Sequence, residues 1–344
     1  MALDKVRAAC ADVADAAGIV IDRDAIHAFL QTLKKQDFDK HKTEHGLRFP
    51  LTFASFEDEV NWISVLALLN AFSGYRIPFH EATGHGAYDN VRRMVLGLYL
   101  SDDAGLSAAS LAQMTSAQLA QILGVPTHTE TRHPTLPFVT VGTRGGPLDE
   151  PLELAATVCR ETGAFLQQRH LPNLGAYVLE ACEAAAAAED ADEAWIAAIR
   201  KVSGFDDAFT DHGQCVFLGK KAYFLLHALR SMLQRPDLPP ALSHLRAYYE
   251  THKPAPLPMF VDNVVPTMLM AHHILSFAGS AEPALRAWQA VPQTGTAAVE
   301  GPCLSRETAY RVRAAALAAG AQIVNMAHTL AQTSPDKAFG AYRG

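Results

Sequence analysis

The sequence predicts a mostly α-helical fold with one or two minor β hairpins. Apolar residues recur three and four positions apart through most of the chain, as they do on one face of a helix. Ala, the strongest helix former, is abundant, and short apolar runs bounded by turn residues are few. With 344 residues, 49% of them apolar and 19% charged, the chain can bury a large core.

The expected elements follow from this periodicity. Helical spacing extends over residues 4–17, 24–35, 57–73, 89–100, 151–169, 174–188, 192–202, 220–234, 241–250, 264–278 and 304–331. Thr115, with Gln118 three residues later, forms a capping-box pattern, and Asp192 precedes another short helix. Residues 136–141 and 215–218 are apolar runs bounded by Gly or Pro, which indicates strands.

The composition excludes several classes of protein. The net charge is −7 and no basic run is visible, so we do not expect the chain to bind a nucleic-acid polymer directly. The longest uncharged stretches contain polar residues, which predicts no membrane span, and the acidic, amphipathic first residues are unlike a secretory signal. We therefore expect a cytoplasmic protein. The cysteines form no CxxC pair and are expected to be small buried residues in a reducing compartment: Cys10, Cys159, Cys182, Cys215 and Cys303.

A near match to a zinc-protease motif lies at His80, Glu81 and His85. That chemistry needs two histidines four residues apart on one helix face. Here the histidines are five apart, and on a helix their side chains would diverge by roughly 140°. We therefore favour a polar loop entering the next helix, and we expect neither a metal nor a cofactor.

Asp262 is the carboxylate with the clearest chemical interest. It follows the apolar residues Met259 and Phe260 and precedes an apolar segment with Pro266, which the first turn of a helix tolerates. One interpretation is an ordinary helix N-cap. The other is an ionised carboxylate, held at a helix N-terminus, that faces a cation forming in a cleft. Local sequence does not separate the two.

Lys220 and Lys221 open a helix directly after the strand expected at residues 215–218. Two ammonium groups at such a place can bind a phosphate monoester, and the alternative is a solvated helix start. The sequence contains no GxSxG, Walker or dinucleotide-binding motif, which disfavours serine hydrolases, nucleoside triphosphatases and Rossmann oxidoreductases.

Five segments together resemble the queuosine salvage family of queuosine 5′-phosphate N-glycosylases. They are DEVNWISVLALLNAF (58–72), ETGAFL (161–166), NLGAYVLEAC (173–182), VFLGKKAYFLLHAL (216–229) and PMFVDNVVPTML (258–269), the last being the most specific. The resemblance implies a scaffold similar to helical DNA glycosylases, built as a single domain over residues 1–344. We expect it to divide further into two helical lobes, about 1–150 and 151–344, with the site between them. The long segment 75–150 indicates a divergent eukaryotic branch, fungal or algal.

The resemblance also implies roles for particular residues. Phe260 and Asp262 match the family's aromatic and aspartate, which bind the 7-deazaguanine base and serve the glycosidic cleavage. His45 is the counterpart of a family histidine near the base. Asn263 stands where the family has a tyrosine, and Tyr310 is the nearest substitute for a C-terminal acidic, aromatic motif that has no match here. The candidate substrate-binding residues are therefore Phe260, His45, Asn263, Lys220, Lys221 and Tyr310, and Asp262 is the candidate catalytic residue.

The sequence thus leads to one main hypothesis and two alternatives. The main hypothesis is a hydrolase that frees queuine from queuosine 5′-phosphate for salvage into tRNA, with a small nucleotide as its partner. The family's aromatic cluster after the LN pair is here NAFSG (70–74), which keeps Phe72 but lacks one or two of the family's large rings. A nucleobase-binding paralogue that has lost turnover is therefore one alternative, and a glycosylase for another nucleotide is the other.

Overall fold

A computed structural model of the protein describes residues 3–34, 51–101, 105–133, 135–136, 138–251, 256–289 and 303–333. The described chain is mostly helical, with short two-stranded antiparallel sheets, and the fold class predicted from the sequence is confirmed. No helix in these ranges is long and apolar enough to cross a membrane.

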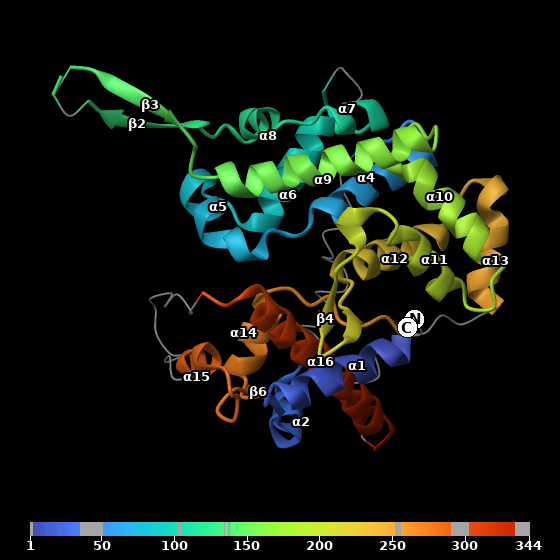
Figure 1. The fold of residues 1–344 in the computed structure, drawn as a ribbon. Coiled ribbons are helices and arrows are strands. Elements are labelled where there is room, and N and C mark those ends of the chain that lie inside the picture. Colours follow the sequence, from blue (N-terminus) through green and yellow to red (C-terminus); the bar gives the residue numbers. More distant parts are fainter. Residues whose placement is uncertain are drawn as a thin grey trace. The chain divides into compact units, whose positions relative to one another are not determined.

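The chain divides into two compact units, and each is assembled from separate stretches of sequence. Unit 1 comprises Met1–Leu51, Asp207–Tyr223 and Pro254–Gly344, and unit 2 comprises Thr52–Asp206 and Phe224–Lys253. The boundary between them falls within helix α12 (Lys220–Leu233). Figure 1 labels the elements of both units.

Unit 1 combines the first and last helices of the described chain with a hairpin from its middle. Its elements are α1 (Leu3–Ala16), β1 (Val20–Ile21), α2 (Arg23–Thr32), β4 (Ala208–Asp211), β5 (Gln214–Phe217), α14 (Val264–Ala271), β6 (Leu275–Ser276), α15 (Pro283–Gln289) and α16 (Arg306–Thr333).

Unit 2 is a helical assembly that carries one long hairpin. Its elements are α4 (Phe56–Leu69), η1 (Phe72–Tyr75), α5 (Arg76–Thr83), α6 (Ala87–Tyr99), α7 (Ala108–Ala112), α8 (Ser116–Leu123), β2 (His128–Arg132), β3 (Thr140–Arg144), α9 (Asp149–Gln168), α10 (Leu174–Ala185), α11 (Ala191–Ile199), η2 (Ser203–Phe205), η3 (Pro240–Leu242) and α13 (Ser243–Thr251).

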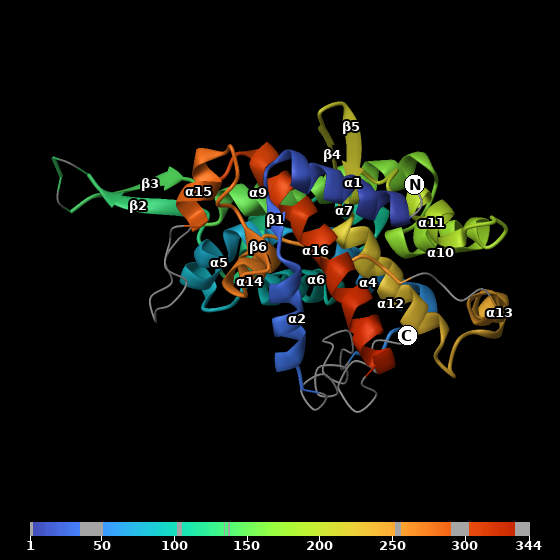
Figure 2. The same ribbon diagram turned by 90° about the horizontal axis from the view of Figure 1, so that it is seen from below.

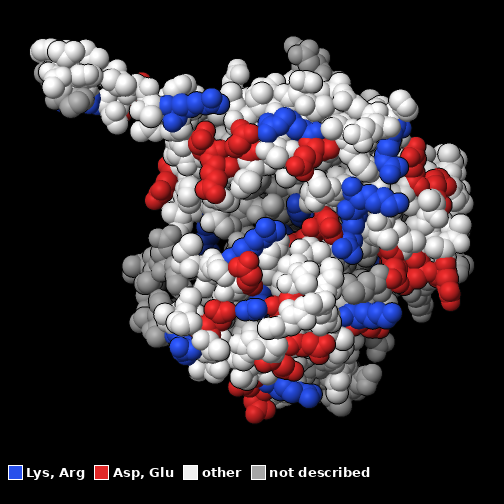
Figure 3. Space-filling view, viewed as in Figure 1, with Lys and Arg blue, Asp and Glu red and all other residues white. Residues whose placement is uncertain are grey.

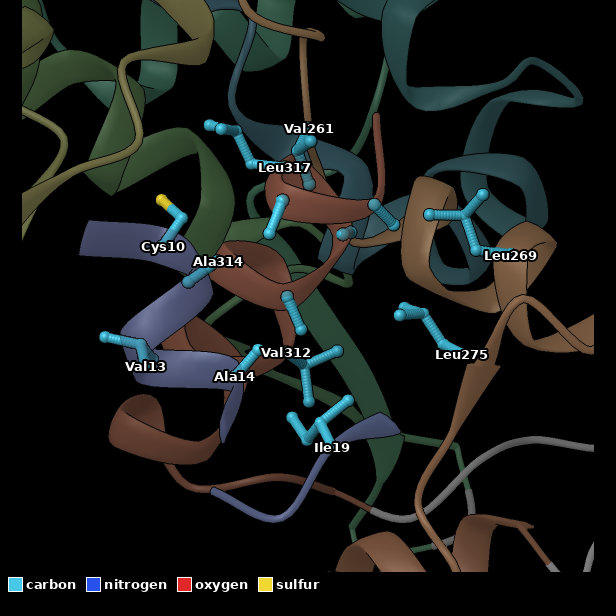
Figure 4. Packing of buried hydrophobic residues seen from close by; sticks show 14 of the residues in the cluster. Cys10, Val13, Ala14, Ile19, Val261, Leu269, Leu275, Val312, Ala314 and Leu317 are labelled. Atoms are coloured by element: carbon cyan, nitrogen blue, oxygen red, sulfur yellow. The ribbon is translucent and has the colours of Figure 1, made fainter. Parts of the chain in front are cut away.

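The core of unit 1 is built on the pairing of α1 with α16, which lie side by side in both ribbon views (Figures 1 and 2). Small side chains let these helices approach closely, since the alanines between residues 314 and 319 are at most 3% exposed. Figure 4 shows Cys10 and Ala14 of α1 beside Ala314 of α16. The apolar face predicted for residues 304–331 is therefore part of the core.

The helix predicted over residues 264–278 is wrong in its second half. Helix α14 ends at Ala271, and His273 takes a left-handed φ of 59° that turns the chain out of the helix. The chain then forms β6, which pairs antiparallel with β1 through Val20–Ser276 and Ile21–Leu275. Two-residue strands more than 250 positions apart leave no periodicity for sequence analysis to detect.

Unit 2 depends on close helix crossings at glycine. A Cβ atom on Gly163 of α9 would lie 2.2 Å from the backbone nitrogen of Ala112 in α7. At Gly175 of α10, a Cβ would lie 2.6 Å from the backbone nitrogen of Asn61 in α4. This close contact also lets the Asn61 side chain bond to α10. Its Oδ1 accepts a hydrogen bond from the Gly175 amide at 3.2 Å.

One helix begins where its capping signal predicts, and other elements begin earlier or later than expected. The Thr115–Gln118 capping box begins α8 as predicted. Helix α11 begins earlier than predicted, because the Asp190 side chain caps it and Asp192 lies in its first turn. The strand expected at 136–141 starts later, since β3 begins at Thr140 and pairs with β2, a polar strand without an apolar pattern.

The cysteines follow the prediction in part. Cys10, Cys159 and Cys182 are buried, and burial raises the pKa of each thiol to about 12. The expectation was wrong for Cys215 and Cys303, which are exposed. Cys215 lies on β5, in a four-residue strand whose first half faces solvent.

We predict that Gly163→Ala destabilises unit 2. Alanine favours a helix interior over glycine by about 1 kcal/mol, so propensity alone would stabilise α9. The added methyl group instead meets the backbone of α7, and we expect the free energy of unfolding to fall by about 1–3 kcal/mol in urea titrations. A rise in stability would contradict the close packing of α7 on α9.

Candidate functional site

The segment around Asp262 is anchored in the core of unit 1. Val261 is fully buried in the cluster that α1 and α16 form, and Figure 4 shows it beside Leu317. Met259, two residues earlier, lies against α16 at Gly320, where a Cβ would come within 2.7 Å of the methionine methyl. The chain therefore leaves the core at Asp262, whose side chain is 21% exposed.

The two oxygens of the Asp262 carboxylate have different partners. Oδ1 accepts hydrogen bonds from the backbone amides of Val264 at 2.8 Å and Val265 at 3.3 Å. These are amides of the first turn of α14, so the carboxylate caps the helix from the position before its N-cap, Asn263. Oδ2 lies 3.3 Å from Nζ of Lys220. Asp262 therefore caps α14, but from the position before the N-cap and not as the ordinary N-cap that one interpretation expected, and its second oxygen faces the Lys220 ammonium group.

Lys220 and Lys221 begin α12, and this helix start is not solvated. The Lys220 side chain is 13% exposed, and burial lowers its pKa against the opposing effect of Asp262. Burial lowers the pKa of Lys221 further, to about 8, although the Asp207 carboxylate favours its charged form. Gly219 precedes them with a φ of +61°, where a Cβ would meet the Phe217 ring. This glycine sets the sharp entry into the helix.

Asp207 and Arg313 form the second ion pair of the site. The Arg313 guanidinium donates to Oδ1 of Asp207 at 3.1 Å and to Oδ2 at 2.5 Å, a bidentate arrangement. The same guanidinium donates to the backbone carbonyl of Val261 at 3.2 Å. Arg313 therefore ties the start of β4 to the residue that precedes Asp262.

The charges of this cluster do not cancel. Lys220, Lys221 and Arg313 are three cationic groups, and Asp207 and Asp262 are two carboxylates, so these five side chains carry a net charge of +1. Both lysines also lie at the N-terminal end of a helix, where the macrodipole is positive. The arrangement favours an added anion.

The remaining predicted residues have different positions. Tyr310 stacks on Phe209 with ring centroids 4.8 Å apart and planes at 17°, and the Arg313 guanidinium lies 5.5 Å from the Tyr310 ring. Phe260 is partly buried, and Asn263 is exposed at the N-cap of α14. His45 lies outside the described residues. The structure therefore brings Asp262, Lys220 and Lys221 together, with Tyr310 linked to them through Arg313.

One small cavity lies near this segment. It has a volume of about 130 Å³ and is lined by Met259, Leu317 and residues of α1 and α16, but not by Asp262. Ligand pockets usually measure about 300–1,000 Å³, so this cavity alone does not hold a nucleotide.

Sequence reasoning missed Asp207 and Arg313. The available signal was Arg313 itself. It is the one charged residue between Val312 and Ala319, and all the other residues of this stretch are buried. An arginine in such a position needs a partner. The sequence does not say which carboxylate supplies it, because Asp207 is 106 positions away.

Among the residues that the structure describes, no three His, Cys, Asp or Glu side chains gather in a way that could hold a metal ion. Comparisons of the sequence with protein families and with curated proteins found no match.

We predict that Arg313→Met lowers the free energy of unfolding by roughly 3 kcal/mol or more, because it removes the bidentate hydrogen-bonding partner of the partly buried Asp207 carboxylate. Adding Asp207→Asn should recover part of this loss in urea titrations. Arg235→Met is the matched control, because Arg235 makes a bidentate pair with Glu59 but is 36% exposed, and we expect it to cost about 1 kcal/mol or less. Equal losses for the two arginines would contradict this assignment.

We predict that the Lys221 ammonium group opposes folding, most strongly below about pH 8 and less at higher pH. Its pKa is about 8 in the folded protein and 10.5 ordinarily, so between these values the unfolded chain binds more protons and stability rises with pH. Lys221→Met removes this charge. The stability gained by the variant should be largest at pH 7, at up to about 3 kcal/mol, and should shrink towards pH 10. A gain that urea titrations find independent of pH would contradict the burial of this ammonium group.

Proposed function

We propose that the protein hydrolyses the N-glycosidic bond of queuosine 5′-phosphate and releases queuine. The observation that carries the proposal is the Asp262 carboxylate, which is fixed by backbone amides through one oxygen and is 3.3 Å from a lysine through the other. It lies within the segment that most resembles the queuosine salvage family, next to the two lysines that the sequence analysis assigned to a phosphate.

The reaction separates the base from the ribosyl group. The bond from the anomeric carbon to the base nitrogen breaks, water oxygen bonds to that carbon, and the base leaves with a proton. Positive charge develops on the sugar in the oxocarbenium-like transition state. A fixed carboxylate stabilises this charge and can orient or deprotonate the water, and Asp262 is assigned both roles.

The lysines are assigned to the 5′-phosphate of the nucleotide. In the unbound protein Lys220 faces Asp262 at 3.3 Å, and a phosphate dianion competes for the same ammonium group. Binding would then leave the Asp262 oxygen available to the sugar. Phe260 is assigned to the base, where stacking on a nucleobase contributes roughly 1–3 kcal/mol in other proteins.

The charge distribution favours a small nucleotide over a nucleic-acid polymer. Figure 3 shows Lys and Arg interspersed with Asp and Glu on the face that it presents. A protein that grips a nucleic-acid backbone usually presents a field of basic residues, and the chain as a whole carries a net charge of −7. We assign the proposed salvage reaction to the cytoplasm, because the longest uncharged stretches contain polar residues and the acidic first residues are unlike a secretory signal.

We predict that purified protein releases queuine from queuosine 5′-phosphate and that Asp262→Asn slows release by about 10²–10⁴-fold. The asparagine oxygen can still accept the amides of Val264 and Val265, so the variant should fold normally. Free queuine is measured by liquid chromatography and mass spectrometry. Asp22→Asn is the matched control, because Asp22 also accepts a first-turn amide, that of Ala25, at 2.9 Å and lies in the same unit. It should retain full activity.

The alternatives give different results in the same assay. A paralogue that only binds would raise its melting temperature with the nucleotide and release no base. A glycosylase for another nucleotide would show Asp262-dependent release from that compound alone. Equal loss of release in Asp262→Asn and Asp22→Asn would overturn the catalytic assignment of Asp262.

A further inference from the structure

The β2–β3 hairpin extends away from the helices of unit 2 in both ribbon views (Figures 1 and 2). Every residue of both strands is exposed. The connection between them carries apolar side chains into solvent, with Phe138 99% exposed and Leu136 53% exposed. A two-stranded ribbon of this kind is marginally stable alone, and its two edges are templates for further strands.

The register defines which backbone groups face the free edge of β2. His133 donates to the Val139 carbonyl and Gly145 donates to the Thr127 carbonyl, so odd-numbered residues of β2 bond towards β3. The amides and carbonyls of His128, Glu130 and Arg132 therefore point outward. They form no hydrogen bond with any residue that the structure describes.

We propose that β2 pairs antiparallel with β2 of a second copy of the chain, about a two-fold axis through Thr131. Glu130 then lies opposite Arg132 of the partner subunit, and Arg132 opposite Glu130 of the partner subunit. Each of these pairs exchanges two backbone hydrogen bonds, and the result is a four-stranded sheet, β3–β2–β2–β3. The dimer is independent of the enzymatic proposal.

Charge complementarity selects this partner and this register. Glu130 and Arg132 are exposed and form no ion pair with a described residue, and β3 places Gly142 and Thr140 opposite them. An axis through Glu130 would oppose two glutamates, and an axis through Arg132 would oppose two arginines, both unfavourable. The axis at Thr131 instead gives two Glu–Arg pairs and a Thr–Thr pair, and this edge is complementary to itself.

The free edge of β3 lacks this property. Its outward residues are Thr140, Gly142 and Arg144, with no carboxylate for the arginine and a glycine at the centre. The area that pairing over five residues of β2 would bury is small beside the about 1,200–2,000 Å² of a stable interface. The dimer should therefore dissociate on dilution.

The test is sedimentation of the full chain over a range of concentrations. We expect a monomer–dimer equilibrium. Glu130→Arg and Arg132→Glu, made separately, each turn two opposite-charge pairs into like-charge pairs and should weaken dimerisation by about tenfold or more. The double variant Glu130→Arg/Arg132→Glu re-forms both pairs with reversed sign and should return to within about threefold of the wild type. Arg144→Glu, an equal change in charge on the β3 edge, should have no effect.

The residues concerned are fully on the surface, so all four variants should match the wild type in circular dichroism and urea unfolding. A monomer at every concentration would overturn the proposal. So would a dimer that neither single variant weakens, or a double variant no better than the single ones.

Discussion

The site depends on the guanidinium of Arg313. This one group binds the Asp207 carboxylate through two hydrogen bonds and the Val261 carbonyl through two more, so it joins the start of β4, the segment before α14 and the N-terminal third of α16. Val261 is held on its other side by the apolar core that α1 and α16 form. Because the backbone is fixed at Val261, the position of the next residue, Asp262, is fixed as well. The backbone of the catalytic candidate is thus positioned by a core contact and an ion pair, and its carboxylate is held by the amides of Val264 and Val265.

The electrostatics of the cluster follow from that framework. Two lysines begin α12, at the end of a helix where cations are unfavourable, and burial lowers the pKa of both. Asp207 and Asp262 offset part of this cost, but one positive charge remains uncompensated among the five groups. Such an imbalance is a reason for an anion to bind, and the nucleotide phosphate that we propose would supply one. The Lys220–Asp262 contact would then couple the proposed phosphate site to the carboxylate, because both share one ammonium group.

Sequence analysis predicts the fold class because helix periodicity and caps are local. The capping box at Thr115 and the hairpin before Lys220 are examples, and both are present. The sequence cannot place residues that meet only in the folded chain. Lys220 is 42 positions from Asp262, and Asp207 is 106 positions from Arg313. Local signals also fail where pairing with a distant segment determines the structure. The apolar residues after α14 continue the helical pattern, but in the folded chain they form β6 and pair with β1. For Asp262 the local sequence offered a helix cap and a carboxylate facing a cation as alternatives. In the structure Oδ1 alone makes the cap, and Oδ2 faces Lys220.

We propose that Asp262 and the two lysines form one nucleotide site, with the carboxylate at the glycosidic bond. A crystal structure of the Asp262→Asn protein grown with queuosine 5′-phosphate measures this most directly, because the variant should bind the nucleotide without cleaving it. We expect phosphate oxygens at about 3 Å from Nζ of Lys220 and the anomeric carbon facing the side chain at position 262. A nucleotide bound elsewhere on the protein, or one whose phosphate lies away from both lysines, would contradict it.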